Sequence, residues 1–244
     1  MTDTTTELRS KPSAEIPDPS ASKSVSEAIA TRRSIRAFKD TPVPLGLIRS
    51  ILDKARLSPS GCNFQPWKAT VLTGAPLEAL QAKLVEARPQ SPEEYPIIPK
   101  GMPDLYMDRQ REVGASMYAS EGIARDDAEG RRRISGRNLT SFGAPMLLVC
   151  YMDRIMGAPQ WSDVGMWLQS IMLLLREEGL DSCPQEYMAL YARLIKEHIG
   201  VSDEDYILFC GLAIGYRDED APVNQFQRSR LALEDQVTFL GFED

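Results

Sequence analysis

The sequence of 244 residues is poor in the side chains that build metal sites and nucleophilic triads. Its one histidine, His198, lies near the end of a helical pattern, and no neighbour suits a zinc site or a serine–histidine–aspartate triad. Its four cysteines include no C-x-x-C pair, and Cys150 and Cys210 lie in apolar runs typical of buried strands. We therefore expect no metal site, a structural role for His198 at a helix C-terminus, and a reduced, cytoplasmic protein.

The sequence also lacks long apolar runs and an excess of positive charge. No stretch of 18 apolar residues occurs, so no membrane span is predicted, and the polar N-terminus contains no secretory signal. The net charge of −7 and the pI of about 5.0 argue against binding to nucleic acid or to anionic membranes. No G-x-G-x-x-G or Walker pattern supports a Rossmann dinucleotide site or a P-loop. Any bound anion must therefore be held by a local basic cluster.

Helix and strand patterns begin after residues 1–22, a polar stretch that we expect to be a disordered tail. Ser24 and Glu27 have the spacing of a capping box and predict a short helix, and Pro44 fits the first position of a second helix. Strands are predicted at Lys68–Thr73, Pro145–Met152, Leu180–Cys183 and Ile207–Ile214, and further helices at Ala75–Ala87, Trp161–Glu178 and Leu190–His198. This order predicts one α+β domain over residues 23–244, ending in a polar arm at about residues 217–244.

Two segments of the predicted domain are unusual. Residues 88–140 contain five prolines in their first sixteen positions, followed by two polar stretches with helical spacing, Asp104–Gly122 and Ala124–Leu139. Because this segment is too polar for a core and too regular for a linker, we expect an inserted cap that lies over another part of the protein. The helix Trp161–Glu178 is apolar on nearly all sides, which predicts burial between two subunits, with Trp167 in that interface.

Arginines gather in two short segments of this acidic chain. They are Arg32, Arg33 and Arg36, with Ser34 among them, and Arg228 and Arg230 near the C-terminus. Guanidinium groups match phosphate oxygens in bidentate pairs, and a serine hydroxyl adds a neutral donor, so a phosphate site is one interpretation. A solvated basic patch is the other interpretation, and composition alone favours it.

Two more segments are unusual in composition. Ser58–Trp67 joins small residues, two carboxamides and two aromatic rings in ten positions. Carboxamides both donate and accept hydrogen bonds, which suits the edge of a heteroaromatic ring, although a plain loop with a buried Trp67 is the alternative. In Asp181–Tyr187, Pro184 leaves backbone N–H groups free on the residues that follow it, and an ordinary strand end is the alternative.

Together these segments resemble the nitroreductase family of FMN enzymes. The resemblance depends on R-R-S-I-R-A-F (Arg32–Phe38), S-P-S-G-C-N-F-Q-P-W (Ser58–Trp67), G-L-D-S-C-P-Q-E (Gly179–Glu186) and R-S-R (Arg228–Arg230), in that order, across about Val25 to Leu231. It implies a nitroreductase-like α+β fold, in which helices flank a central, mostly antiparallel sheet and two chains form a domain-exchanged homodimer.

The resemblance also implies a role for each motif. The residues expected to bind FMN are Arg32, Arg33, Ser34, Arg36, Pro59, Ser60, Gly61, Asn63, Pro184, Gln185, Glu186, Arg228 and Arg230. The phosphate and ribityl chain would be held by Arg32, Ser34, Arg228 and Arg230. Arg36 would approach the N1/O2 edge of the ring. Pro59 to Asn63 would come from the partner subunit, and the backbone N–H of Glu186 would be directed at flavin N5. No residue is assigned as a catalytic acid, so Arg36 and the Glu186 backbone are expected to tune the flavin and water to deliver protons.

The implied activity is an FMN-dependent NAD(P)H oxidoreductase that uses NADH or NADPH and then reduces a small electrophilic acceptor in a ping-pong cycle. Arg137–Pro145 resembles a subgroup that acts on nitroaromatics, whereas Tyr187 stands where a glycine is common in the family. Two alternatives stay open. One is a different reaction on the same fold, namely reductive dehalogenation (with Glu94, Tyr95 and Lys100 as a possible cluster), flavin fragmentation or azoline oxidation. The other is a flavin-binding protein without turnover.

Overall fold

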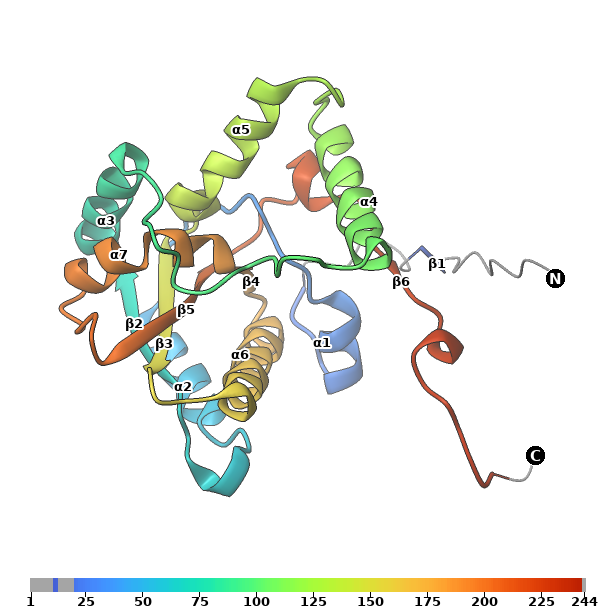
Figure 1. Ribbon diagram of the computed structural model, residues 1–244, viewed down its shortest axis with the longest axis horizontal. Coiled ribbons are helices and arrows are strands. Elements are labelled where there is room, and N and C mark those ends of the chain that lie inside the picture. Colours follow the sequence, from blue (N-terminus) through green and yellow to red (C-terminus); the bar gives the residue numbers. More distant parts are fainter. Residues whose placement is uncertain (1–10, 13–19, 243–244) are drawn as a thin grey trace.

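The structure, a computed structural model, describes residues 11–12 and 20–242 and has a four-stranded sheet at its centre (Figure 1). The strands are β2 (Lys68–Thr73), β3 (Met146–Asp153), β4 (Asp181–Gln185) and β5 (Tyr206–Gly215). They lie in the order β2-β3-β5-β4, and each neighbouring pair is antiparallel. The prediction of an α+β fold with a central, mostly antiparallel sheet is confirmed.

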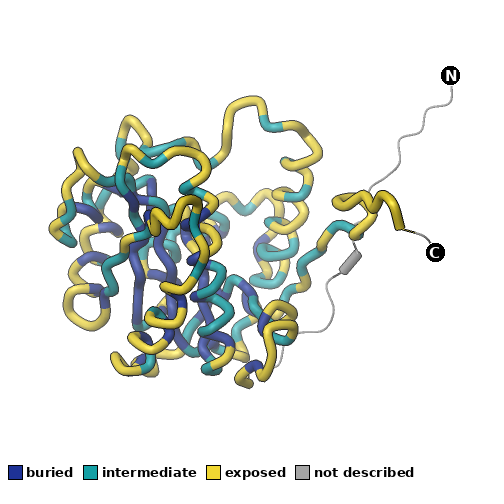
Figure 2. The backbone as a smooth tube through the Cα atoms, turned by 90° about the horizontal axis from the view of Figure 1, so that it is seen from below, coloured by how far each residue is buried: buried dark blue, intermediate teal, exposed yellow. Residues whose placement is uncertain are grey.

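Side chains that alternate along β3 give the sheet two hydrophobic faces. The helices that cover it are α2 (Leu45–Ala55) and α6 (Ala158–Glu177) on one face, and α3 (Gly74–Glu86) and α7 (Ala192–His198) on the other. Leu148 and Cys150 are buried with α2 and α6, whereas Leu147 and Val149 are buried with α3 and α7. Figure 2 shows the buried residues concentrated in these layers.

The helix ends agree with their predicted signals in most places. Helix α1 (Val25–Thr31) begins at Ser24, whose Oγ accepts the Glu27 N–H at 3.2 Å. The Glu27 carboxylate accepts a hydrogen bond from the N–H of Lys23 at 2.6 Å. The predicted capping box would instead use the N–H of Ser24, the next residue. Pro44 is the N-cap of α2 and not its first residue. Helix α7 ends at His198, whose Nε2 lies 2.9 Å from the Pro76 carbonyl oxygen, which gives this residue the expected structural role.

The position of Trp167 in α6 contradicts one expectation. Trp167 is 5% exposed in the single chain, where its ring stacks on Trp67 with 5.9 Å between centroids. The prediction that Trp167 is buried between subunits is therefore wrong, because its own chain already covers it. Met166, the next residue towards the N-terminus, is 41% exposed.

The segment expected to be a cap contains two helices that project from the body in Figure 1. They are α4 (Asp104–Ser120) and α5 (Ala128–Gly136), followed by the 3-10 segment η2 (Arg137–Gly143). Helix α5 begins later than predicted because Asp127 caps it, accepting the Gly130 N–H at 2.8 Å. Ser141 and Phe142 have positive φ angles of 51° and 56°, which end the helical path before β3.

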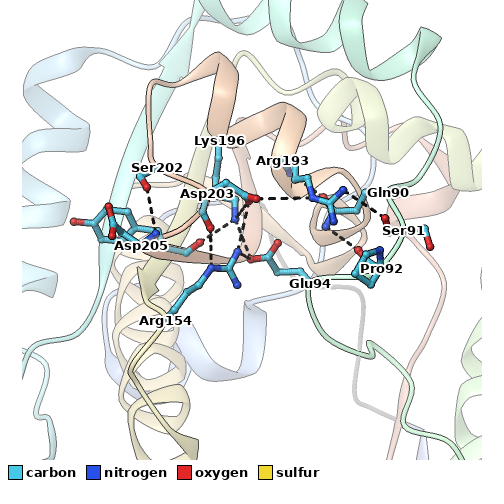
Figure 3. A network of polar contacts seen from close by, with 11 residues as sticks. Gln90, Ser91, Pro92, Glu94, Arg154, Arg193, Lys196, Ser202, Asp203 and Asp205 are labelled. Carbon is cyan, nitrogen blue, oxygen red and sulfur yellow. Dashed lines mark hydrogen bonds and ion pairs between the residues drawn. The ribbon is translucent and has the colours of Figure 1, made fainter.

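A buried ion-pair network attaches the start of the cap to the body (Figure 3). Lys196 of α7 is fully buried, and its Nζ lies 3.0 Å from Glu94 Oε1 and 2.6 Å from Asp203 Oδ1. Arg154, which follows β3, lies 2.7 Å from the same Glu94 oxygen. Because Glu94 is also nearly fully buried, this part of the cap is held by charges that water screens little.

The next residue, Tyr95, continues this attachment. Its hydroxyl donates to the carbonyl of Phe209 in β5, and its ring packs edge-on against Trp161 with 5.1 Å between centroids. The side chains of Glu94 and Tyr95 are thus engaged with the body. This arrangement weighs against the cluster with Lys100 that dehalogenation of an amino acid would require.

The two chain ends meet near the segment that contains Arg228 and Arg230. Strand β1 (Lys11–Pro12) pairs with β6 (Ser229–Arg230), and the Ser22 N–H donates to the Arg176 carbonyl at 2.8 Å. Most of the tail expected over residues 1–22 lies outside the described residues. Beyond β6 the chain leaves the body (Figures 1 and 2) and exposes apolar side chains, among them Leu240 at 85%. Within the described ranges, no helix has the length and apolar character needed to cross a membrane.

Candidate functional site

The segment with the first arginines runs beside β4, an edge strand of the sheet. The Ile35 N–H donates to the Ser182 carbonyl at 3.1 Å, and Ser34 pairs with Ser182 as an isolated bridge. The extended backbone gives side chains a period of two, so neighbours point to opposite sides. Arg33, Ile35 and Ala37 are buried, whereas Arg32, Ser34 and Arg36 are half-buried on the other side.

Five arginines converge at this edge of the protein, and we call them the arginine cluster: Arg32, Arg33, Arg36, Arg228 and Arg230. Burial, and then repulsion from Arg33, Arg36 and Arg32, lowers the pKa of Arg228 to about 9. Burial followed by the charge of Arg230 also lowers the pKa of Arg32. Arginines that are partly buried and crowded together in a protein of net charge −7 favour a site for an anion.

Buried polar atoms without a partner mark the same place. Among the described residues, four buried side-chain atoms make no hydrogen bond: Arg33 Nη1, Asp163 Oδ2, Ser182 Oγ and Gln185 Oε1. Leaving such groups unpaired is costly, so each needs an explanation such as a bound ligand. Three of the four lie on the arginine segment and β4. The donors present there, guanidinium and hydroxyl groups, fit the phosphate and ribityl oxygens of FMN.

The end of β4 brings the third predicted motif next to the cap. Pro184 is exposed, Gln185 is buried, and Glu186 begins the 3-10 segment η3 (Glu186–Tyr191). The Gln185 amide Nε2 donates to the carbonyl of Asn138 in η2 at 2.9 Å. Burial raises the pKa of Glu186.

A cavity of about 170 Å³, which we call the inner cavity, lies between the arginine segment, β4 and the cap. Its walls are Arg36, Cys183 and Pro184 from the body and Met117, Ile134, Ser135, Asn138 and Phe142 from the cap and η2. Burial raises the pKa of Cys183 to about 11 against the opposing effect of Arg36, Arg228 and Arg32. The charges of the arginine cluster therefore act on Cys183 in the wall of the inner cavity. The cap forms another wall of this cavity.

The remaining predicted residues lie on the Ser58–Trp67 loop, most of which is exposed. Cys62, Asn63 and Gln65 have positive φ angles of 50°, 58° and 49°, a conformation that costs energy for residues other than glycine and often marks functional loops. The Gly61 N–H donates to Asp163 Oδ1 of α6 at 3.2 Å, and the Ser58 hydroxyl bonds Ser170 at 2.9 Å.

Within one chain this loop and the arginine cluster lie towards opposite ends of α6. Gly61 of the loop contacts α6 at Asp163, whereas Arg176 near the C-terminal end pairs at 3.2 Å with Asp181 of β4. The two positions are roughly 20 Å apart at 1.5 Å per residue. The structure thus brings Arg32, Arg33, Ser34, Arg36, Pro184, Gln185, Glu186, Arg228 and Arg230 together and leaves Pro59, Ser60, Gly61 and Asn63 elsewhere.

Sequence reasoning missed three residues that organise the site. Asp181 accepts hydrogen bonds from Arg217 at 2.6 and 2.7 Å and from Arg176, so one carboxylate pairs with two arginines beside the cluster. Asn224 accepts the backbone N–H of Arg36 at 2.8 Å. Asp163 is 3% exposed in α6. An acid directly before the apolar part of this helix was a usable signal for Asp163, whereas the other two depend on contacts distant in sequence.

Comparison with known proteins identifies similar sequences. A profile described as the nitroreductase family matches residues 29–216. A 4-nitrobenzoate reductase from Pseudomonas putida is 39% identical over 217 residues, which are 88% of this chain and 95% of that protein.

Two solved structures are also similar. The FMN and NADPH-dependent nitroreductase NfnB from Sphigopyxis sp. strain HMH is 49% identical with a TM-score of 0.86, covering 90% of this chain and 100% of that one. The FMN-dependent nitroreductase NfnB from Mycobacterium smegmatis, solved in complex with NADPH, is 29% identical with a TM-score of 0.83, covering 88% and 96%.

Proposed function

Because this chain belongs to the nitroreductase family, we propose that it is an FMN-dependent NAD(P)H nitroreductase that acts as a cytoplasmic homodimer on nitroaromatic acceptors. The observation that carries the proposal is the arginine cluster with its unpaired buried atoms, directly beside a cavity that the cap closes. Relatives whose names state FMN, NADPH and nitroaromatic substrates support it.

The arginine cluster would hold the phosphate of FMN. A phosphate close to Arg228, Arg32 and Arg230 would relieve their mutual repulsion and offer oxygen acceptors to their guanidinium groups. The Asn224 side chain fixes the backbone of Arg36, so this cation keeps one position beside the inner cavity. A cation there would stabilise negative charge on a bound ring.

Loop residues Pro59 to Asn63 would complete the site of the partner subunit. The loop is exposed, is anchored to Asp163, and stays distant from the arginines of its own chain. Asn63 and Gln65, which carry carboxamide groups, are exposed on this constrained backbone. This arrangement supports a homodimer in which each site needs both chains.

Bound FMN supplies the transfer of two electrons from the nicotinamide to the acceptor. The protein positions the reactants and excludes water. The inner cavity has apolar walls at Met117, Ile134 and Phe142, and the polar Ser135 and Asn138 can orient a nitro group. Its volume of about 170 Å³ is below that of pockets for drug-sized ligands, so it accommodates one ring at a time. Nicotinamide and acceptor must then take turns, which is a ping-pong cycle.

The test combines cofactor content with reduction. The purified protein should contain one FMN per chain, bleach under anaerobic NADPH or NADH, and regain its colour on addition of 4-nitrobenzoate or nitrobenzene. A flavin that no nicotinamide reduces would favour a binding protein without turnover. Fast reduction followed by oxidation only with a halogenated or azoline substrate would favour a different reaction on this fold.

A further inference from the structure

A second and larger cavity lies within the cap itself, and we call it the outer cavity. It has a volume of about 840 Å³ and lies between α4 and α5, which Figure 1 shows diverging from their connecting loop towards the body. Gln110, Arg111 and Tyr118 of α4 line it, with Arg125 of the connecting loop and Arg131 of α5. This volume is within the range of pockets that bind drug-sized molecules.

The outer and inner cavities are neighbours along the same two helix faces. On α4, Gly114 and Tyr118 line the outer cavity and Met117 lines the inner one. On α5, Arg131 lines the outer cavity, and Ser135, one turn later, lines the inner one. Residues three and four apart share a helix face, and one turn advances only about 6 Å. A single extended molecule can therefore occupy both cavities.

The lining of the outer cavity has an excess of positive charge, because Arg111, Arg125 and Arg131 face it with one acid, Glu112. Arg111 pairs with Asp108 and Asp104. In contrast, neither Arg125 nor Arg131 has a carboxylate within ion-pair distance among the described residues, and the Arg131 Nε donates only to the Asp127 carbonyl, at 3.4 Å. Two unpaired guanidinium groups at one concave surface favour a phosphate or carboxylate ligand.

We propose that the outer cavity binds the adenosine end of the nicotinamide donor, with Arg125 and Arg131 recognising the 2′-phosphate that distinguishes NADPH from NADH. This inference rests on the proposed function, because the nicotinamide ring must lie in the inner cavity. The volume favours the donor over the acceptor: a nitroaromatic acid has one ring, which the inner cavity already accommodates. Tyr118 provides an aromatic surface for the adenine.

Binding of adenosine fragments tests the site directly. Adenosine 2′,5′-bisphosphate and adenosine 5′-monophosphate differ only in the 2′-phosphate, and calorimetry on the FMN-loaded protein compares them. The bisphosphate should bind more tightly. In the double variant Arg125→Gln/Arg131→Gln its affinity should fall roughly 10- to 100-fold, with little change for the monophosphate. The matched control is Arg133→Gln, which removes the same charge from an exposed position of α5 outside both cavities.

Steady-state kinetics provides the second measurement. The double variant should raise KM for NADPH and leave KM for NADH and kcat nearly unchanged. Equal binding of the two fragments, or an equal loss in Arg133→Gln, would overturn the inference. A raised KM for 4-nitrobenzoate, but not for neutral nitrobenzene, would overturn it too, because the arginines would then bind the acceptor. If neither nicotinamide reduces the flavin, the proposed function fails, while the fragment titration still reports on the outer cavity.

Discussion

The arginine cluster should make the FMN-free protein less stable than it would be with one arginine fewer. The pKa of Arg228 is about 9, roughly 3.5 units below the usual arginine value, because the site is buried and crowded with cations. At about 1.36 kcal/mol per pKa unit, holding Arg228 charged costs at most about 5 kcal/mol. Solvent screening of a half-buried group reduces this, and we expect about 1–3 kcal/mol.

The variant Arg228→Gln should therefore stabilise the FMN-free protein and weaken the binding of FMN. Without FMN it should unfold about 2–12 °C higher than the wild type, at about 2–4 °C per kcal/mol for a domain of this size. Its affinity for FMN should fall roughly 10- to 100-fold, because a charged hydrogen bond contributes about 1.5–3 kcal/mol. Thermal unfolding with and without FMN, followed by circular dichroism, measures both effects.

The sign of the pH dependence is a further check on the same variant. The pKa of Arg228 is lower in the folded than in the unfolded protein, so its charge destabilises the folded protein fully below pH 9. Above pH 9 the folded protein releases this proton, and the destabilisation declines. The stability advantage of Arg228→Gln should thus shrink above pH 9. The exposed Arg49→Gln is the control and should change neither form. An FMN-free Arg228→Gln protein that is less stable than wild type would refute the argument from repulsion.

Four more changes test the site and its supports. Arg36→Ala should lower the two-electron midpoint potential by about 30–60 mV, where 30 mV is about 1.4 kcal/mol; an unchanged potential with FMN bound would separate Arg36 from the ring. Dilution should release FMN and dissociate the dimer over the same range of concentration, as measured by sedimentation. A monomer that retains FMN would contradict the shared site. Lys196→Met should lower the free energy of unfolding in urea by about 3 kcal/mol, because the buried Glu94 then keeps only the partly exposed Arg154 as its partner; a loss under about 1 kcal/mol would contradict that role. Shortening α4 and α5 should preserve FMN binding but change the order of acceptors by kcat/KM, and an unchanged order would assign acceptor choice to the body.

Local signals in the sequence predicted the fold almost completely. Apolar runs of strand length at Lys68–Thr73 and Ile207–Ile214 match β2 and β5 because β-branched and apolar residues there suit a buried sheet. The capping box at Ser24 predicted the start of α1 for the same local reason. The prediction that Trp167 is buried between subunits failed because apolar periodicity shows that a helix is buried, but not which element covers it. Here Trp67 of the same chain covers Trp167.

The candidate site was predictable only through the resemblance and not from composition. Arginine pairs are usually solvated, and nothing local distinguishes Arg228 from a surface residue. What distinguishes it is long-range: β4 pairs with β5, the segment of Arg36 lies on β4, and Asn224 ties that segment to the C-terminal arm. No sequence window contains these contacts, so the phosphate site is a property of the fold.

The distribution of unpaired buried atoms links the two halves of the proposed site. Arg33, Ser182 and Gln185 have free polar atoms at the arginine cluster, and Asp163 has one where it holds the Gly61 loop. A fold can satisfy such atoms with its own groups, with water or with a ligand, and leaving one unpaired costs about 1–3 kcal/mol. If a second chain brings its loop to the arginines, the flavin at that junction offers acceptors to Arg33 and Ser182, and the partner chain offers donors to Asp163. The FMN-bound dimer would then satisfy groups that a single chain leaves unpaired, which is a physical reason for assembly and cofactor binding to be coupled.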